Sequence, residues 1–207
     1  NKVLSTIKQM FTYALSKGII EHNPAQGTNS INIGGKEKPR DRNLSLEEIK
    51  LIWQWLDNED NHRFHPATPT ALKILLLTGV RSGGLRTAEW SEVDLDAALW
   101  TIPKEKYKTG IEHKVHLTSF TIKHLQDLKD LSGSQWVLPS IKDNSKPLTD
   151  KALARAVKRT EGRIEDIPPW TPHDLRRTFN TQLSAMGITP RLSKRPCFIV
   201  IILLLFG

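Results

Sequence analysis

Apolar residues recur every three or four positions through most of the 207-residue chain, which is the spacing of one face of an α-helix. This pattern predicts helices over residues 3–15, 45–56, 71–78, 83–91, 119–130, 149–159 and 171–186. Two short segments, 99–103 and 114–117, instead have the composition of strands, with a turn near residues 107–110 between them. The chain is therefore predicted to be mainly α-helical with one small antiparallel β-sheet.

Individual residues support two of these helices. Ser45 followed by Glu48 is the signature of a capping box, in which each side chain bonds the other residue's backbone N–H. Residues 71–77 are apolar on nearly every side, which predicts a helix buried in the core and ended at Gly79.

A change of composition divides the chain. Residues 23–43 are rich in glycine, proline and asparagine, which is typical of a linker. We therefore expect one helix in residues 1–25, a basic linker over 26–43 and a packed body over 44–190. Residues 191–207 form an aberrant tail whose apolar run, 197–206, has no periodicity and is half as long as the ~20 residues that span a bilayer.

Composition narrows the possible functions. The chain has 30 Lys and Arg against 22 Asp and Glu, a net charge of +8, which favours a polyanionic partner such as nucleic acid. Both ends are basic: residues 1–43 carry seven basic and three acidic residues, and 151–207 carry ten and four. A single cysteine excludes an internal disulfide framework and any multi-cysteine zinc site.

The strongest chemical feature is the start of the helix predicted over 171–186. Thr171 is a suitable N-cap and Pro172 suits the first helical position. His173, Arg176 and Arg177 then fall on one polar arc, separate from an apolar arc. An imidazole and a guanidinium beside helix-end amides suit a phosphate, although a solvated basic face explains the same residues.

Two further basic residues lie at turns. Arg81 stands between Gly79 and Gly83 directly after the buried helix, and Lys108 lies near the turn of the predicted hairpin. Taken alone, each is as well explained as a structural or solubilising residue. His113 and His116 would lie on opposite faces of a strand, so the sequence predicts no metal site. Glycine-rich nucleotide motifs and a serine-nucleophile motif are absent from the sequence, and we expect neither a cofactor nor a small-molecule substrate.

Taken together, the order Arg81, Lys108, His173 and Arg176 resembles the tyrosine recombinase family of phage and genomic-island integrases. The segment 78–81 followed by 90–95 is similar to the family's first arginine box, and 172–178 to its second and most specific box. Residues 13–24 resemble the last helix of the family's core-binding domain, and the likeness extends to about residue 190. The resemblance implies the fold of a recombinase catalytic domain and double-stranded DNA as partner.

The resemblance also implies metal-free phosphoryl transfer. Arg81 and Arg176 would clamp the oxygens of the scissile phosphate, Lys108 would protonate the leaving 5′ oxygen, and His173 would assist proton transfer. The basic linker residues and the second helix arginine would contact the DNA backbone, and these are Lys36, Lys38, Arg40, Arg42 and Arg177. Other recombinase protomers are further expected partners, in the bacterial cytoplasm with the nucleoid.

Several positions depart from the family pattern. Gly84 replaces a glutamate that commonly supports the first arginine, and His116 replaces a proline. The tail does not match the segment that carries the nucleophilic tyrosine, and Tyr13 and Tyr107 lie in segments that do not correspond to it. Our interpretation is a tail arising from frameshift or gene decay. Three functions stay open: a recombinase domain inactive in this chain, a DNA-binding remnant that occupies recombination sites or pairs with an intact recombinase, and, less favoured, a hydrolytic nuclease.

Overall fold

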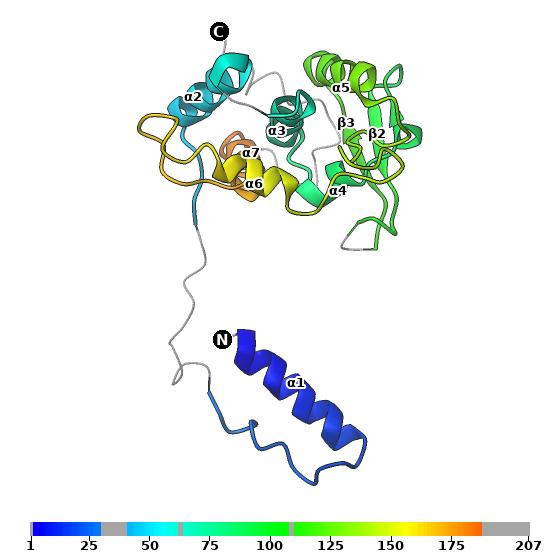
Figure 1. The fold of residues 1–207 in the computed structure, drawn as a ribbon, viewed down its shortest axis with the longest axis vertical. Helices are drawn as coiled ribbons and strands as arrows, with labels where there is room; N and C mark the ends of the chain where they lie inside the picture. Colours follow the sequence, from blue (N-terminus) through cyan, green and yellow to red (C-terminus); the bar gives the residue numbers. More distant parts are fainter. Residues whose placement is uncertain (1, 30–40, 62–63, 108–109, 188–207) are drawn as a thin grey trace. The chain divides into compact units, whose positions relative to one another are not determined.

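A computed structural model describes residues 2–29, 41–61, 64–107 and 110–187 of the chain (Figure 1). Clustering of its contacts divides the chain into two compact units, Asn1–Asp41 and Arg42–Gly207.

The first unit contains one helix and a returning segment. Helix α1 spans Lys2–Ser16, as predicted, and ends in a turn at Gly18, whose φ is +68°. The side-chain amide nitrogen of Asn23, Nδ2, donates to the Lys8 carbonyl over 3.3 Å and to the Thr12 hydroxyl over 3.1 Å, which ties the returning segment to the helix. No residue of α1 is buried, and several of its apolar residues, including Val3 and Met10, are exposed.

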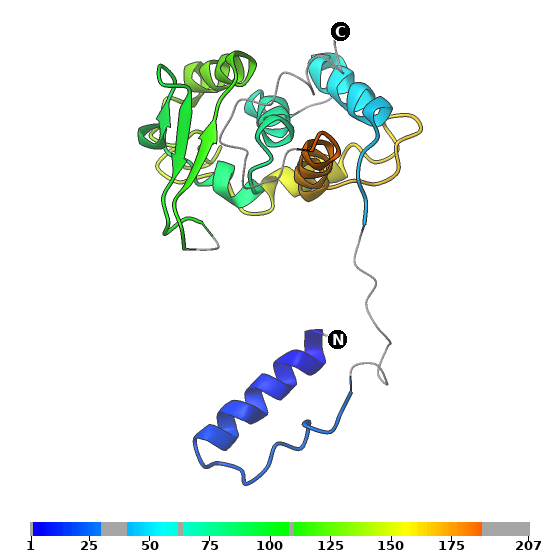
Figure 2. The same ribbon diagram turned by 180° about the vertical axis from the view of Figure 1, so that it is seen from behind.

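Helix α3 is the centre of the second unit. It spans Ala67–Thr78, and nine of its twelve residues are buried, as its uniformly apolar sequence predicts. It packs against α5, Ser119–Ser132, on one side and α7, Pro172–Ala185, on the other, as Figures 1 and 2 both show. Helix α2, Leu46–Asp57, and helix α6, Ala152–Lys158, complete this layer of helices. The central position of α3 means that its C-terminal turn is fixed by the whole core.

A three-stranded antiparallel sheet lies at one end of the second unit, visible at the left of Figure 2. Its order is β1 (Val93–Asp94), β2 (Leu99–Ile102) and β3 (His113–His116). Trp100 pairs with Val115, and both point into the core, as does Ile102. The two longer strands confirm the predicted hairpin, whereas the two-residue β1 is too short to give a sequence pattern and was not predicted.

Three helix boundaries differ from the predictions, each for a local reason. Helix α4 spans only Ser82–Arg86, because Glu89 pairs with Trp136 in an isolated bridge and Trp90–Glu92 form a short 3-10 helix. Helix α6 starts late because residues 149–151 form a turn closed by the Ala152 N–H on the Thr149 carbonyl. Helix α3 starts early, at Ala67, because a proline is tolerated in a first helical turn.

Both predicted helix starts are confirmed. The Ser45 hydroxyl accepts from the Glu48 N–H, and the Glu48 carboxylate accepts from the Ser45 N–H over 2.8 Å. Thr171 and Asp174 form the same reciprocal pair at the start of α7, with Pro172 in the first turn. The first residues of α7 are therefore held by their own sequence. No helix among the residues that the structure describes is long and apolar enough to cross a membrane.

Gly79 joins α3 to α7 by a close approach. It ends α3 in the left-handed conformation, with φ +59°, and a Cβ built on it would overlap the ring of Phe179 in α7. Any larger residue would therefore be strained in its backbone and would push the two helices apart.

We predict that Gly79→Ala lowers the free energy of unfolding by about 3 kcal/mol, from backbone strain and overpacking together. Gly133→Ala is the matched control, because Gly133 also ends a helix with a positive φ, +52°, but faces open space. The control should cost only about 1 kcal/mol. Urea denaturation of both variants measures the difference, and equal losses would show that the contact with Phe179 is unimportant.

Candidate phosphate-binding site

Arg81 stands where the chain leaves α3 and enters α4. It is the N-cap of α4 in an extended conformation, two residues after the tight turn at Gly79. Its guanidinium carbon lies 5.0 Å from the centroid of the Tyr107 ring, a cation–π distance. Its Nη1 atom is buried and has no hydrogen-bond partner. Arg81 thus presents a partly desolvated cation with donor capacity to spare.

The start of α7 supplies the second cation. The capping box at Thr171 and Asp174 fixes the first turn, and Leu175 and Phe179 are buried against the core. This confirms the two arcs predicted for the helix, since His173 stays exposed and Arg176 is half-buried on the polar arc. The Arg176 guanidinium donates to the carbonyl oxygen of Gly79, so the turn that positions Arg81 also anchors Arg176.

The two arginines are close enough to affect one another. Burial lowers the pKa of Arg176, the positive charge of Arg81 lowers it further, and the Tyr107 side chain opposes both effects. Two guanidinium groups held close together repel each other, and an anion placed between them would relieve this repulsion. The arrangement therefore favours binding of an anion such as a phosphate.

The hollows around these residues show which of them share a space. One hollow is lined by Arg81, by His173, by residues of α4 and by the segment after β2, including Glu105 and Tyr107. A second hollow, which also includes Tyr107 in its lining, is lined by Gly79 and by residues of β3 and α7, among them His113, His116, Arg176 and Asn180. The structure thus places Arg81 and His173 on one hollow and Arg176 on another, with Tyr107 common to both. Lys108 lies outside the described residues.

The segment that leads to Lys108 is anchored through Lys106. The Lys106 ammonium donates to Glu89 over 2.7 Å, to the Thr87 carbonyl over 2.9 Å and to Glu92, whose side chain is only 7% exposed. Burial lowers the pKa of Lys106, but the hydrogen bonds and charges of Glu89 and Glu92 outweigh this and raise it overall. This partly buried ion cluster ties the segment after β2 to the segment after α4.

Tyr107 and His113 belong to the site but were not singled out by sequence reasoning. Their rings stack with centroids 4.6 Å apart. Burial lowers the pKa of His113, and Arg176 and Arg81 lower it further, so this imidazole stays neutral at neutral pH. Periodicity gives no signal for either residue, because Tyr107 lies in the turn after β2 and His113 at the first position of the short strand β3. Gly84 offers Arg81 no side chain, and a Cβ there would meet only Ile102.

Of the five residues predicted to contact the DNA backbone, the structure describes only Arg42 and Arg177. Arg42 lies at the start of the second unit, where its guanidinium donates to Glu48 over 2.7 Å and to the Pro168 carbonyl over 3.1 Å. Arg177 is half-buried next to Arg176. Lys36, Lys38 and Arg40 lie outside the described residues. A role of these five residues in DNA binding stays a prediction. In the described parts of the chain, no group of three His, Cys, Asp or Glu could hold a metal ion.

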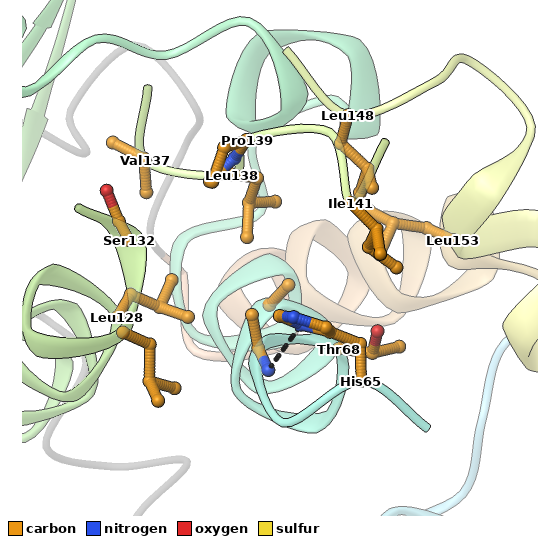
Figure 3. Close-up of a pocket in the computed structure, with 13 residues that line it drawn as sticks. His65, Thr68, Leu128, Ser132, Val137, Leu138, Pro139, Ile141, Leu148 and Leu153 are labelled. Atoms are coloured by element: carbon orange, nitrogen blue, oxygen red, sulfur yellow. Dashed lines mark hydrogen bonds between the residues drawn. The ribbon is translucent and has the colours of Figure 1, made fainter. Parts of the chain in front are cut away.

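A second type of pocket in this unit is apolar. It lies between α3, α5 and the segment that leads to α6, with Leu128, Leu138 and Leu153 on its walls and His65 at its edge (Figure 3). The His65 Nδ1 accepts a hydrogen bond from the Ala67 backbone N–H over 3.3 Å, so this imidazole serves the start of α3. None of the arginines described above lines this pocket.

Comparison with known sequences identifies one matching family. The model of the phage integrase family matches residues 42–193. Prophage integrase IntA of Escherichia coli (strain K12) is 27% identical over 192 residues, which are 91% of this chain and 44% of the relative. The integrase of Enterobacteria phage P4 is 28% identical over 165 residues, 73% of this chain and 37% of the relative. The chain spans about two fifths of the length of these curated relatives.

Solved structures show the same fold. The Tn1549 transposon integrase, solved in complex with a circular intermediate DNA, has a TM-score of 0.70 at 17% identity, covering 99% of this chain and 73% of that one. A lambda integrase tetramer bound to a Holliday junction has a TM-score of 0.69 at 21% identity, covering 95% and 56%. The predicted fold, a mainly helical recombinase catalytic domain with a small antiparallel sheet, is confirmed.

We predict that Lys106→Met lowers the free energy of unfolding by roughly 2 kcal/mol at neutral pH, because it leaves two carboxylates, of which Glu92 is largely buried, without their counter-ion. Since the folded state raises the pKa of Lys106 above its ordinary 10.5, the contribution is complete below pH 10.5 and is lost as the pH rises beyond it. Unfolding of both proteins in urea at neutral pH and above pH 10.5 measures this. Lys104→Met, at an exposed pair with Glu105, is the control and should be nearly neutral. A constant difference at all pH values would contradict the ion cluster.

Proposed function

Because the chain belongs to the phage integrase family, we propose that it binds duplex DNA and that Arg81, His173 and Arg176 hold the scissile phosphate of a recombination site. The family carries out site-specific DNA recombination by breaking and rejoining strands. The observation that carries the proposal is the joint placement of the two arginines. Gly79 ends the helix that leads to Arg81 and also accepts a hydrogen bond from Arg176.

The chemistry of phosphoryl transfer fits this arrangement. In the transition state, negative charge accumulates on the non-bridging phosphate oxygens, and two forked guanidinium groups can donate to both of them. The exposed His173 imidazole, at the edge of the Arg81 hollow, can move a proton to or from the reacting oxygens. We assign Lys108 as the group that protonates the leaving 5′ oxygen, by its match to the family motif.

We propose that this chain by itself binds DNA without forming a covalent link to it. The family reaction needs a tyrosine oxygen that attacks phosphorus while the bond to the 5′ oxygen breaks. The chain has two tyrosines, and neither Tyr13 in α1 nor Tyr107 in the turn after β2 lies in the segment that matches the family nucleophile. The second candidate function, occupation of recombination sites without catalysis, follows from the same observation.

The proposal also covers the partners of the chain and its place in the cell. The Tn1549 integrase was solved on DNA and lambda integrase as a DNA-bound tetramer, and we propose by analogy that further recombinase protomers join this chain on its DNA. We expect the protein in the bacterial cytoplasm with the nucleoid, where such DNA lies. We propose no metal and no small-molecule substrate for the reaction.

Removal of either arginine should weaken DNA binding. We predict that Arg81→Ala or Arg176→Ala lowers the affinity for a duplex about tenfold and lowers the slope of log affinity against log salt by about one, the effect of one lost phosphate contact. Arg163→Ala, at an exposed arginine that lines neither hollow, is the charge-matched control and should leave the slope close to that of the original protein. Fluorescence anisotropy across a salt series gives both quantities, and an affinity independent of salt would refute the proposal.

Covalent chemistry is tested separately. Duplexes that the protein selects from a random-sequence pool would be rebuilt with a nick beside each phosphate in turn, so that any phosphotyrosyl adduct is trapped. We expect binding and no adduct on a denaturing gel. An adduct would show that the chain has a nucleophile and would contradict the proposal. Cleaved DNA without an adduct would favour the hydrolytic nuclease.

A further inference from the structure

Tyr107 occupies the space between the two arginines of the phosphate site. The Arg81 guanidinium lies over the face of its ring at 5.0 Å, and Tyr107 lines the same hollow as Arg176 and acts to raise the pKa of that guanidinium. The ring also stacks on His113. One side chain therefore lies next to both cations.

The two hollows show the consequence of this position. Tyr107 lines both of them, whereas Arg81 lines only one and Arg176 only the other. The Tyr107 side chain is therefore part of the lining that these two hollows share. A phosphate that contacts both guanidinium groups would have to occupy space that the Tyr107 side chain fills.

Tyr107 is a weaker partner for these cations than a phosphate. A ring face offers Arg81 only a quadrupole, and its buried Nη1 atom still has no hydrogen-bond partner. A phosphate would give both arginines charge-assisted hydrogen bonds and would offset the repulsion that lowers the pKa of Arg176. The neighbouring Lys106 is fixed by its own ion cluster, so a rotation of the Tyr107 side chain can open the site while that anchor stays in place.

We propose that Tyr107 closes the phosphate site in the free protein, and that a phosphate reaches both arginines only by displacing the Tyr107 side chain. This rests on the proposed function, since it assumes that Arg81 and Arg176 share one phosphate. Displacing Tyr107 then costs free energy, which lowers the affinity of the site for phosphate. The reduction matters most for phosphates that make few other contacts with the protein.

The displacement can be observed directly, because the chain has only two tyrosines. In protein labelled with 3-fluorotyrosine, the fluorine NMR spectrum shows Tyr107 and Tyr13, and Tyr13→Phe assigns them. Titration with inorganic phosphate should move the Tyr107 signal towards that of an exposed tyrosine and leave the Tyr13 signal unchanged. A Tyr107 signal that stays fixed while calorimetry shows phosphate bound would overturn the proposal.

Variants give a second, independent measurement. Tyr107→Ala should bind inorganic phosphate about tenfold more tightly than the original protein, because the competing contacts are gone. Tyr107→Phe, which keeps the ring over Arg81 but removes the hydroxyl, should show a smaller gain. A gain in affinity is not produced by general damage to the fold. Tyr13→Ala is the matched control and should change nothing.

The outcomes separate the two proposals. If Arg81→Ala weakens phosphate binding but Tyr107→Ala weakens it too, or leaves it unchanged, Tyr107 supports the arginines and the proposed closure is wrong. If Arg81→Ala and Arg176→Ala both leave phosphate binding unchanged, the phosphate site itself is wrong. A gain in Tyr107→Ala that is lost on adding Arg81→Ala supports both.

Discussion

The close approach of Gly79 to helix α7 is the contact on which the rest of the site depends. The missing side chain of Gly79 leaves room for the Phe179 ring, and its carbonyl accepts a hydrogen bond from Arg176. The same residue ends α3 with a positive φ and directs the chain towards Arg81. Because α3 is the most buried helix of the unit, both arginines take their positions from the core rather than from a surface loop.

This placement brings two positive charges close together, and their electrostatic repulsion is unfavourable. Arg176 donates to the Gly79 carbonyl and Arg81 lies over the Tyr107 ring, whereas the carboxylates Glu89 and Glu92 are engaged by Lys106 and Glu105 lines the Arg81 hollow. Because positive charge exceeds negative charge around the two arginines, binding of an anion with diffuse charge would lower the electrostatic energy of the site. In the free protein, the cation–π contact of Tyr107 with Arg81 partly offsets this excess of positive charge. The same contact is the basis of the proposed closure of the site.

Local features of the site could be predicted from sequence, and features built from distant segments could not. The Thr171 N-cap, the polar arc of α7 and the buried α3 all follow from residues within a single helix. The overlap of Gly79 with Phe179 and the role of Tyr107 depend on packing between segments that are far apart in the chain, which leaves no periodic signal. The short β1 and the early end of α4 escaped prediction because bridges and turns, not propensity, determine them. The domain limits at residues 25, 43 and 190 stay predictions.

The central claim is that Arg81 and Arg176 bind the same phosphate, and a double-mutant cycle on DNA affinity tests it most directly. Arg81→Ala, Arg176→Ala and the double variant would be measured on one duplex at one salt concentration. If the two guanidinium groups share a phosphate, the double variant should lose less affinity than the two single losses combined, with a coupling of about 1 kcal/mol or more. Losses that add to within about 0.5 kcal/mol would show that the arginines contact DNA independently, and the account would fail.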